Sequence, residues 1–180
     1  MVEMFVYRVA LDVEQGTAVV LLTEEEPVQR LLPIWIRVFE AQAIAMELHG
    51  ETPPRPYTHD LMAAIVAAVG WRLDHISITD LRDTTFYAVL SLEQDGQVVE
   101  VDARPSDSIA LALRCDARIY VADDVLEKAA IVPGPETPED DVDAFRRLMS
   151  GVDLTVPESG EEPGPPLEPE PPGDSTEEPS

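Results

Sequence analysis

The apolar residues of this chain follow one order twice: three strand-like segments, then a segment with helical spacing. The first set is predicted over residues 2–12, 18–23, 31–36 and 39–48, and the second over 73–81, 85–92, 98–102 and 108–115. Residues 43–48 (AIAMEL) and 108–113 (SIALAL) align at an offset of 65 positions, which indicates an internal duplication. Two related β-β-β-α halves predict an α+β fold with an antiparallel sheet and packed helices.

Local signals add detail to this outline. Pro33 inside the third strand predicts an edge strand or a bulge, because proline cannot donate a hydrogen bond to the ladder. Asp95-Gly96 is typical of a hairpin turn. Thr58 is predicted to cap an apolar helix over 61–69, and a short strand and a helix follow near residues 119–130.

The composition divides the chain at about residue 132. The last 48 residues hold 11 of the 17 prolines and 14 of the 36 acidic residues. We therefore predict a folded domain over 1–132, then a linker with a short amphipathic helix over 133–152. Residues 153–180 are predicted to form a disordered acidic tail, because Pro/Glu-rich sequence cannot build a core.

The charge limits the class of partner. The formal net charge is −24, so no long-range field draws the chain onto phosphates. Eleven of the 12 basic residues are arginine, which suits local bidentate contacts to anions. The longest apolar run, residues 61–71, is too short to span a bilayer. The N-terminus lacks the basic region of a signal peptide, and Cys115 has no disulfide partner, so we expect a cytoplasmic protein without a membrane segment.

The first polar cluster is residues 55–60 (RPYTHD), which combines a cation, an imidazole and a carboxylate before a helix. His59 and Asp60 can serve in proton transfer or as metal ligands. The alternative is structural: Thr58 and Asp60 cap the helix, and His59 is a surface residue.

The second polar cluster is residues 102–107 (DARPSD), again before a helix start, where free N–H groups favour anions. Glu40 occupies roughly the matching position in the first half, so a real duplication would pair Glu40 with Asp107 across one pocket. The alternative gives Ser106 or Asp107 a capping role, pairs Arg104 with Asp102, and leaves Glu40 to interact with the helix dipole.

Several familiar sites are absent from the sequence. It contains no Cys/His zinc pattern, Walker loop, GxSxG elbow or dinucleotide-binding fingerprint. His49 and His75 stand alone. With 6% aromatic residues, no run of the sequence resembles a stacking platform for single strands.

Taken together, these segments resemble the bifunctional nuclease domain family, in the family's order and over about residues 1–132. The matching motifs are LPIWI (32–36), EAxAI (40–44), RPxTHDL (55–61), TFYA (85–88), DARPSDSIALA (102–112) and IYV (119–121). The helix predicted over 138–150 resembles one that often follows this domain in bacteria. Where the family usually carries glycine after its LPIWI strand, this chain has Arg37, which requires an ordinary φ.

The resemblance implies an α+β domain that oligomerises and hydrolyses DNA and RNA phosphodiester bonds. Its polar motif positions suggest His59, Asp60, Asp107 and Glu40 as catalytic residues. The residues suggested for substrate binding are Arg55, Arg104 and Ser106. Glu40, Asp102 and Asp107 are candidate ligands of Mg²⁺ or Mn²⁺, which prefer oxygen. The rival hypothesis is a non-catalytic regulatory or oligomeric interaction module, in which the Arg–Asp motifs form structural pairs.

Overall fold

A computed structural model describes residues 1–12, 17–25 and 30–132. Within them, seven strands and four helices follow one another along the chain. The elements are β1 (Val2–Asp12), β2 (Thr17–Thr23), β3 (Leu31–Arg37), α1 (Val38–Leu48), α2 (Thr58–Ala68), β4 (Arg72–Arg82), β5 (Thr85–Gln94), β6 (Gln97–Ala103), α3 (Pro105–Cys115), β7 (Arg118–Val121) and α4 (Asp123–Ala129). The linker and helix predicted over 133–152 and the tail predicted over 153–180 lie outside the described residues.

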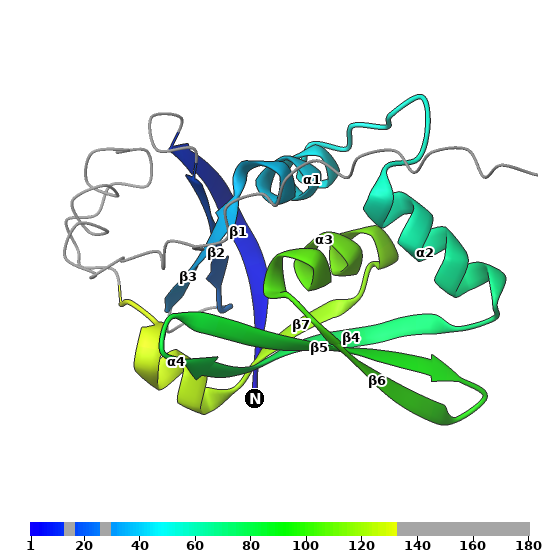
Figure 1. Cartoon of the computed structure of the whole chain (residues 1–180). Coiled ribbons are helices and arrows are strands. Elements are labelled where there is room, and N and C mark those ends of the chain that lie inside the picture. The colour runs from blue at the N-terminus through cyan, green and yellow to red at the C-terminus, as the bar shows by residue number, and fades with distance from the viewer. Residues whose placement is uncertain (13–16, 26–29, 133–180) are drawn as a thin grey trace, which may run out of the picture.

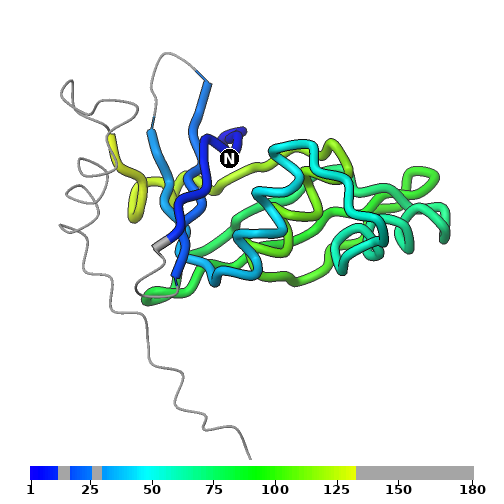
Figure 2. The backbone as a smooth tube through the Cα atoms, turned by 90° about the horizontal axis from the view of Figure 1, so that it is seen from above, coloured from blue at the N-terminus to red at the C-terminus, as the bar shows by residue number. Residues whose placement is uncertain are grey.

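The strands form one sheet in the order β3-β2-β1-β7-β4-β5-β6. Strands β1–β3 make one antiparallel meander and β4–β6 make another. Strand β7 joins the two, antiparallel to β1 and parallel to β4. Helices α1, α2 and α3 lie on the same side of β4–β6 (Figure 1), and α2 lies at the end of the molecule opposite β1–β3 (Figure 2).

The α+β prediction is confirmed, and so is the order of three strands and a helix in each half. The duplication itself stays a prediction. Strand β3 is an edge strand, as Pro33 indicated. Arg37 has a φ of −90° and extended backbone, so a side chain fits where the family usually has glycine.

The core joins both meanders to α3. Four successive residues of α3, Ile109 to Ala112, are buried in one core cluster with Ile76 and Ile78 of β4 and Val20 and Leu22 of β2. Helix α2 is different, because His59 is its buried residue while Leu61 and Ile65 are exposed. The apolar spacing of α2 predicted the helix correctly, but its core face is small, with Met62 and Ala63 partly buried against the core.

The cap of α2 also differs from the prediction. Tyr57 is the N-cap residue, and Thr58 is the first helical residue. The backbone N–H of Tyr57 donates to the Asp60 carboxylate at 2.8 Å. Within the described residues, none of the helices has the length and apolarity needed to cross a membrane.

We predict that Gly96→Ala lowers the free energy of unfolding by about 1 kcal/mol, because left-handed backbone costs a side chain roughly 1–2 kcal/mol. Asp95 and Gly96 have φ values of 50° and 82° in the turn between β5 and β6. The measurement is urea unfolding, with Asp95→Asn as the control, since asparagine tolerates this conformation. Equal stabilities for the two variants would contradict the prediction.

Candidate active site

A pocket of about 1100 Å³ opens where α1, α2 and α3 meet β5 and β6. Its volume is slightly above the usual range of small-molecule sites, roughly 300–1,000 Å³. Five predicted site residues line it: Glu40, His59, Asp102, Arg104 and Asp107. These residues come from α1, α2, β6, the junction after β6, and α3, so the fold brings together polar motifs that are far apart in the chain.

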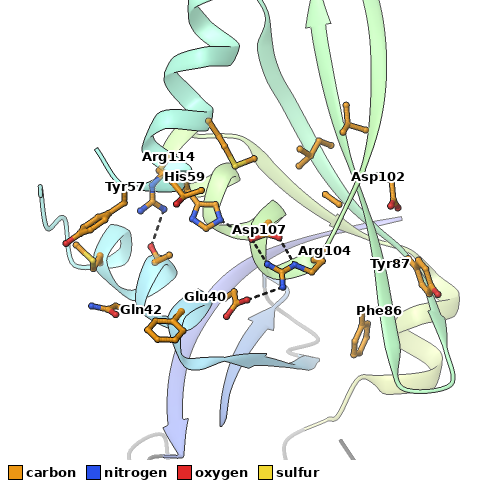
Figure 3. Close-up of a pocket in the computed structure, with 18 of the residues that line it drawn as sticks. Glu40, Gln42, Tyr57, His59, Phe86, Tyr87, Asp102, Arg104, Asp107 and Arg114 are labelled. Atoms are coloured by element: carbon orange, nitrogen blue, oxygen red, sulfur yellow. Dashed lines mark hydrogen bonds and ion pairs between the residues drawn. The ribbon is translucent and has the colours of Figure 1, made fainter. Parts of the chain in front are cut away.

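Four of these side chains form a continuous chain of polar contacts (Figure 3). The Nε2 atom of His59 lies 3.1 Å from Oδ1 of Asp107. Arg104 donates from Nε to Oδ2 of Asp107 at 2.7 Å. Its Nη1 atom lies 3.1 Å from Oε1 of Glu40. The order is therefore His59, Asp107, Arg104, Glu40, with one cation held between two carboxylates.

Local sequence explains why these groups converge. Pro105 occupies the first position of α3, so Arg104 before it is held in extended backbone. Asp107 and Glu40 are both the third residue of their helices, where the helix dipole favours a carboxylate. The two halves thus present an acid at matching positions, and Arg104 bridges them.

The Asp107 carboxyl is held ionised by its neighbours. Burial alone would raise the pKa of Asp107, but hydrogen bonds from Arg104 and His59 outweigh it and hold the pKa below the ordinary value. The hydrogen bond to Asp107 likewise raises the pKa of Arg104. With Asp107 accepting a hydrogen bond from Nε2–H, the neutral His59 ring carries its acceptor at Nδ1. This pairing equips His59 to accept a proton from a nucleophile.

A second polar cluster lies beside the first and centres on Arg114. Its guanidinium donates to the Asp60 carboxylate, to the carbonyl of Ala43 at 3.1 Å and to the carbonyl of Ala110 at 2.9 Å. The Arg114 side chain is only 6% exposed. One side chain therefore ties α1, α2 and α3 together.

Within this cluster, the contacts of Asp60 are structural. Its carboxylate binds Arg114 and the Tyr57 N–H, and the hydrogen bond from Arg114 is the main reason that its pKa lies below the ordinary 3.8. The pair fixes the first turn of α2, which carries His59. Sequence reasoning did not select Arg114, because a basic residue in the last turn of a helix is common.

Asp60 lies outside the pocket lining, and so do two other predicted residues. Arg55 is exposed in the connector before α2, and Ser106 is buried in the first turn of α3. Of the two arginines predicted to clamp a phosphate, Arg104 lines the pocket and Arg55 does not. The catalytic and binding roles of all these residues stay predictions.

The metal hypothesis named Glu40, Asp102 and Asp107. Over the described ranges, no group of three or more His, Cys, Asp or Glu residues is placed to hold a metal ion. Glu40 and Asp107 already share the positive charge of Arg104. The three carboxylates do not fit a metal site in this arrangement, and we derive no catalytic step through a metal.

Aromatic side chains also line the pocket, and sequence reasoning missed them. They are Phe39, Tyr57, Phe86 and Tyr87. Phe39 is 83% exposed although it precedes the partly buried Glu40. Figure 3 shows Tyr57 on one side of Arg104 and Phe86 and Tyr87 on the other. They come from three separate segments, so no run of the sequence could reveal them.

Comparisons with known proteins agree on one domain. The sequence profile of the bifunctional nuclease domain matches residues 19–133, a region that contains every residue of the pocket. "Uncharacterized protein Rv1829" of Mycobacterium tuberculosis (strain ATCC 25618 / H37Rv) is 43% identical over 141 residues, which cover 74% of this chain and 84% of that protein. "Bifunctional nuclease 1" of Oryza sativa subsp. japonica is 26% identical over 105 residues, which cover 57% of this chain and 32% of the rice protein.

We predict that Asp60→Asn lowers the free energy of unfolding at pH 7 by about 2 kcal/mol. This is below the roughly 3–5 kcal/mol for breaking a buried ion pair, because Asp60 is partly exposed and Glu47 lies 3.9 Å from Arg114. A lowered pKa stabilises the folded state above pH 3.8, and that stability is lost as the pH falls through the folded pKa.

Urea unfolding at pH 7 and at about pH 3 measures both effects. The difference between wild type and variant should shrink at the lower pH. Asp74→Asn is the matched control, since Asp74 also pairs with an arginine but is exposed. A difference that does not depend on pH would show that Asp60 does not stabilise the fold through its charge.

Proposed function

The chain belongs to the bifunctional nuclease domain family, and we propose that its pocket hydrolyses phosphodiester bonds of DNA, RNA or both. The observation that carries this proposal is the contact chain of His59, Asp107 and Arg104 within one pocket. It supplies a proton acceptor, a group that orients it, and a cation for a phosphate. The proposed setting is the bacterial cytoplasm, since the relative that aligns over 84% of its length is mycobacterial.

In the proposed reaction, Nδ1 of His59 takes a proton from the attacking hydroxyl, either water or a ribose 2′-OH. The hydroxyl oxygen forms a bond to phosphorus, and the bond from phosphorus to the leaving oxygen breaks. The imidazolium then returns its proton to that leaving oxygen. Asp107 stabilises the imidazolium through Nε2–H.

Arg104 is the proposed phosphate-binding group. A guanidinium has five N–H donors, and its contacts with Asp107 and Glu40 occupy three. The side chain is 64% exposed at the pocket, so the other two donors can meet an incoming phosphate. Developing negative charge on the phosphoryl oxygens would strengthen these contacts in the transition state.

A second candidate function, a regulatory or oligomeric interaction module, is favoured by the surface of α2. Leu61 and Ile65 of α2 and Val69 at its C-cap lie four residues apart, so they share one face, and each is more than half exposed. Packing this stripe against the same stripe of a second copy would remove both from water. We propose a homo-oligomer built on this face, which is compatible with nuclease activity.

We predict that the chain cleaves labelled RNA or DNA and that His59→Gln and Asp107→Asn each lower the rate at least 100-fold. General base catalysis contributes roughly 10²–10⁴-fold. The matched control is His75→Gln, because His75 also contacts an aspartate, Asp74 at 2.9 Å, and lies outside the pocket lining. Its rate should stay within twofold of wild type.

The same assay is run with EDTA, Mg²⁺ and Mn²⁺, so that the metal hypothesis has its own result. Activity in EDTA argues against Mg²⁺ or Mn²⁺ as a required cofactor. Activity that is equal in wild type and both variants would point to a contaminating nuclease or another site. No cleavage under any condition would leave the interaction module as the better hypothesis.

We also predict that wild type elutes as an oligomer and that Ile65→Glu shifts it toward the monomer. Light scattering after size-exclusion chromatography measures the mass. Val98→Glu on β6 is the control, since Val98 is a similarly exposed apolar residue away from α2. A monomeric wild type, or equal masses for wild type and both variants, would refute self-association through α2.

A further inference from the structure

Resting on the nuclease function proposed above, we infer that the pocket selects single-stranded nucleic acid. Unpaired bases would stack on Phe39 and Tyr57 at its mouth while Arg104 binds the adjacent phosphate. Both aromatic residues line the pocket beside the polar contact chain. The inferred substrate is thus a flexible single strand of nucleic acid whose bases can unstack.

The exposure of the two aromatic residues is the first argument. Phe39 is 83% exposed and Tyr57 is 54% exposed, so neither is needed to fill the core. Exposed aromatic surface in a pocket with convergent polar groups is typical of a binding site. Every base has a π-face, so exposed aromatic rings can stack on any base and do not select a nucleotide sequence.

The position of Phe39 is the second argument. It directly precedes Glu40, whose carboxylate contacts Arg104 at 3.1 Å. Phe39, Glu40 and Arg104 all line the pocket, so the aromatic ring and the guanidinium belong to one site. A nucleotide carries its base and its phosphate on the same sugar, so one nucleotide can reach both.

The charge of the domain is the third argument. Residues 1–132 hold 22 acidic and 10 basic residues, so the domain lacks an excess of cations with which to track a duplex backbone. In the pocket, Arg114 is engaged by Asp60, and Arg104 is shared by Asp107 and Glu40. Base contacts must then supply much of the affinity, and a duplex hides its base faces inside the stack.

Fluorescence anisotropy tests this inference on the full chain carrying His59→Gln, which is expected to bind without cleaving, with 12-mer DNA and RNA. The probes are labelled single strands and the same strands annealed to their complements. Single strands should bind at least tenfold more tightly than duplexes. The affinity should fall by about one power of ten per tenfold rise in salt, because neutralising one phosphate gives a slope of roughly −0.7 to −0.9.

Phe39→Ala should weaken single-strand binding about 5-fold to 150-fold, the range that base–aromatic stacking implies. Phe39→Trp should retain binding, and Tyr57→Leu provides a second removal. Phe5→Ala is the matched control, because Phe5 is an exposed aromatic residue on β1, outside the pocket lining. Thermal unfolding of each variant verifies that it is folded.

The outcomes separate this inference from the nuclease proposal. Cleavage of both forms of substrate, with binding that ignores Phe39 and Tyr57, would overturn the single-strand inference and leave the nuclease standing. Binding of single strands that depends on Phe39, without cleavage, would support the inference and reject the nuclease. Equal affinity of the folded His59→Gln chain for single strand and duplex would also overturn it.

Discussion

The site depends on one interaction, the contact of the Arg114 guanidinium with three helices at once. It binds a carboxylate of α2 and carbonyl groups of α1 and α3, and it is almost fully buried. Helix α2 contributes little apolar surface to the core, so hydrophobic burial alone would hold it weakly. The ion pair with Asp60 therefore sets where α2 begins, and with it the position of His59 relative to Asp107.

The sequence predicts the parts of the fold that local patterns encode. Alternating apolar residues, Pro33 and Asp95-Gly96 were enough to place strands, an edge and a hairpin, and the structure agrees. A pocket shared by Glu40 and Asp107 was expected only if the two halves are duplicated, and the family resemblance added His59 and Arg104 as candidate site residues. The sequence did not show that these residues converge, because they lie on separate segments of the chain, and their shared pocket is seen only in the structure.

Other features could not be predicted, for physical reasons. Which face of α2 is buried depends on how far α2 lies from the middle of the sheet, and helical spacing carries no such information. Asp60 follows His59 directly, yet neighbouring side chains on a helix point in different directions, so one reaches Asp107 and the other Arg114. The aromatic residues that line the pocket come from three separate segments, so they are seen to share one site only in the folded structure.

The proposed function requires an acidic domain to bind a polyanion of the same charge, and the pocket suggests how. Glu40 and Asp107 already neutralise the charge of Arg104, so a phosphate that reaches its two remaining donors displaces water there and lies near two carboxylates. Because Arg104 is largely exposed, solvent weakens both sets of contacts, and the exchange yields little net binding. In this proposal, affinity for the strand comes from apolar contact with the bases. Arg104 acts mainly in the transition state, when negative charge grows on the phosphoryl oxygens. On this view the aromatic residues bind the strand, and the polar contact chain acts on the bond.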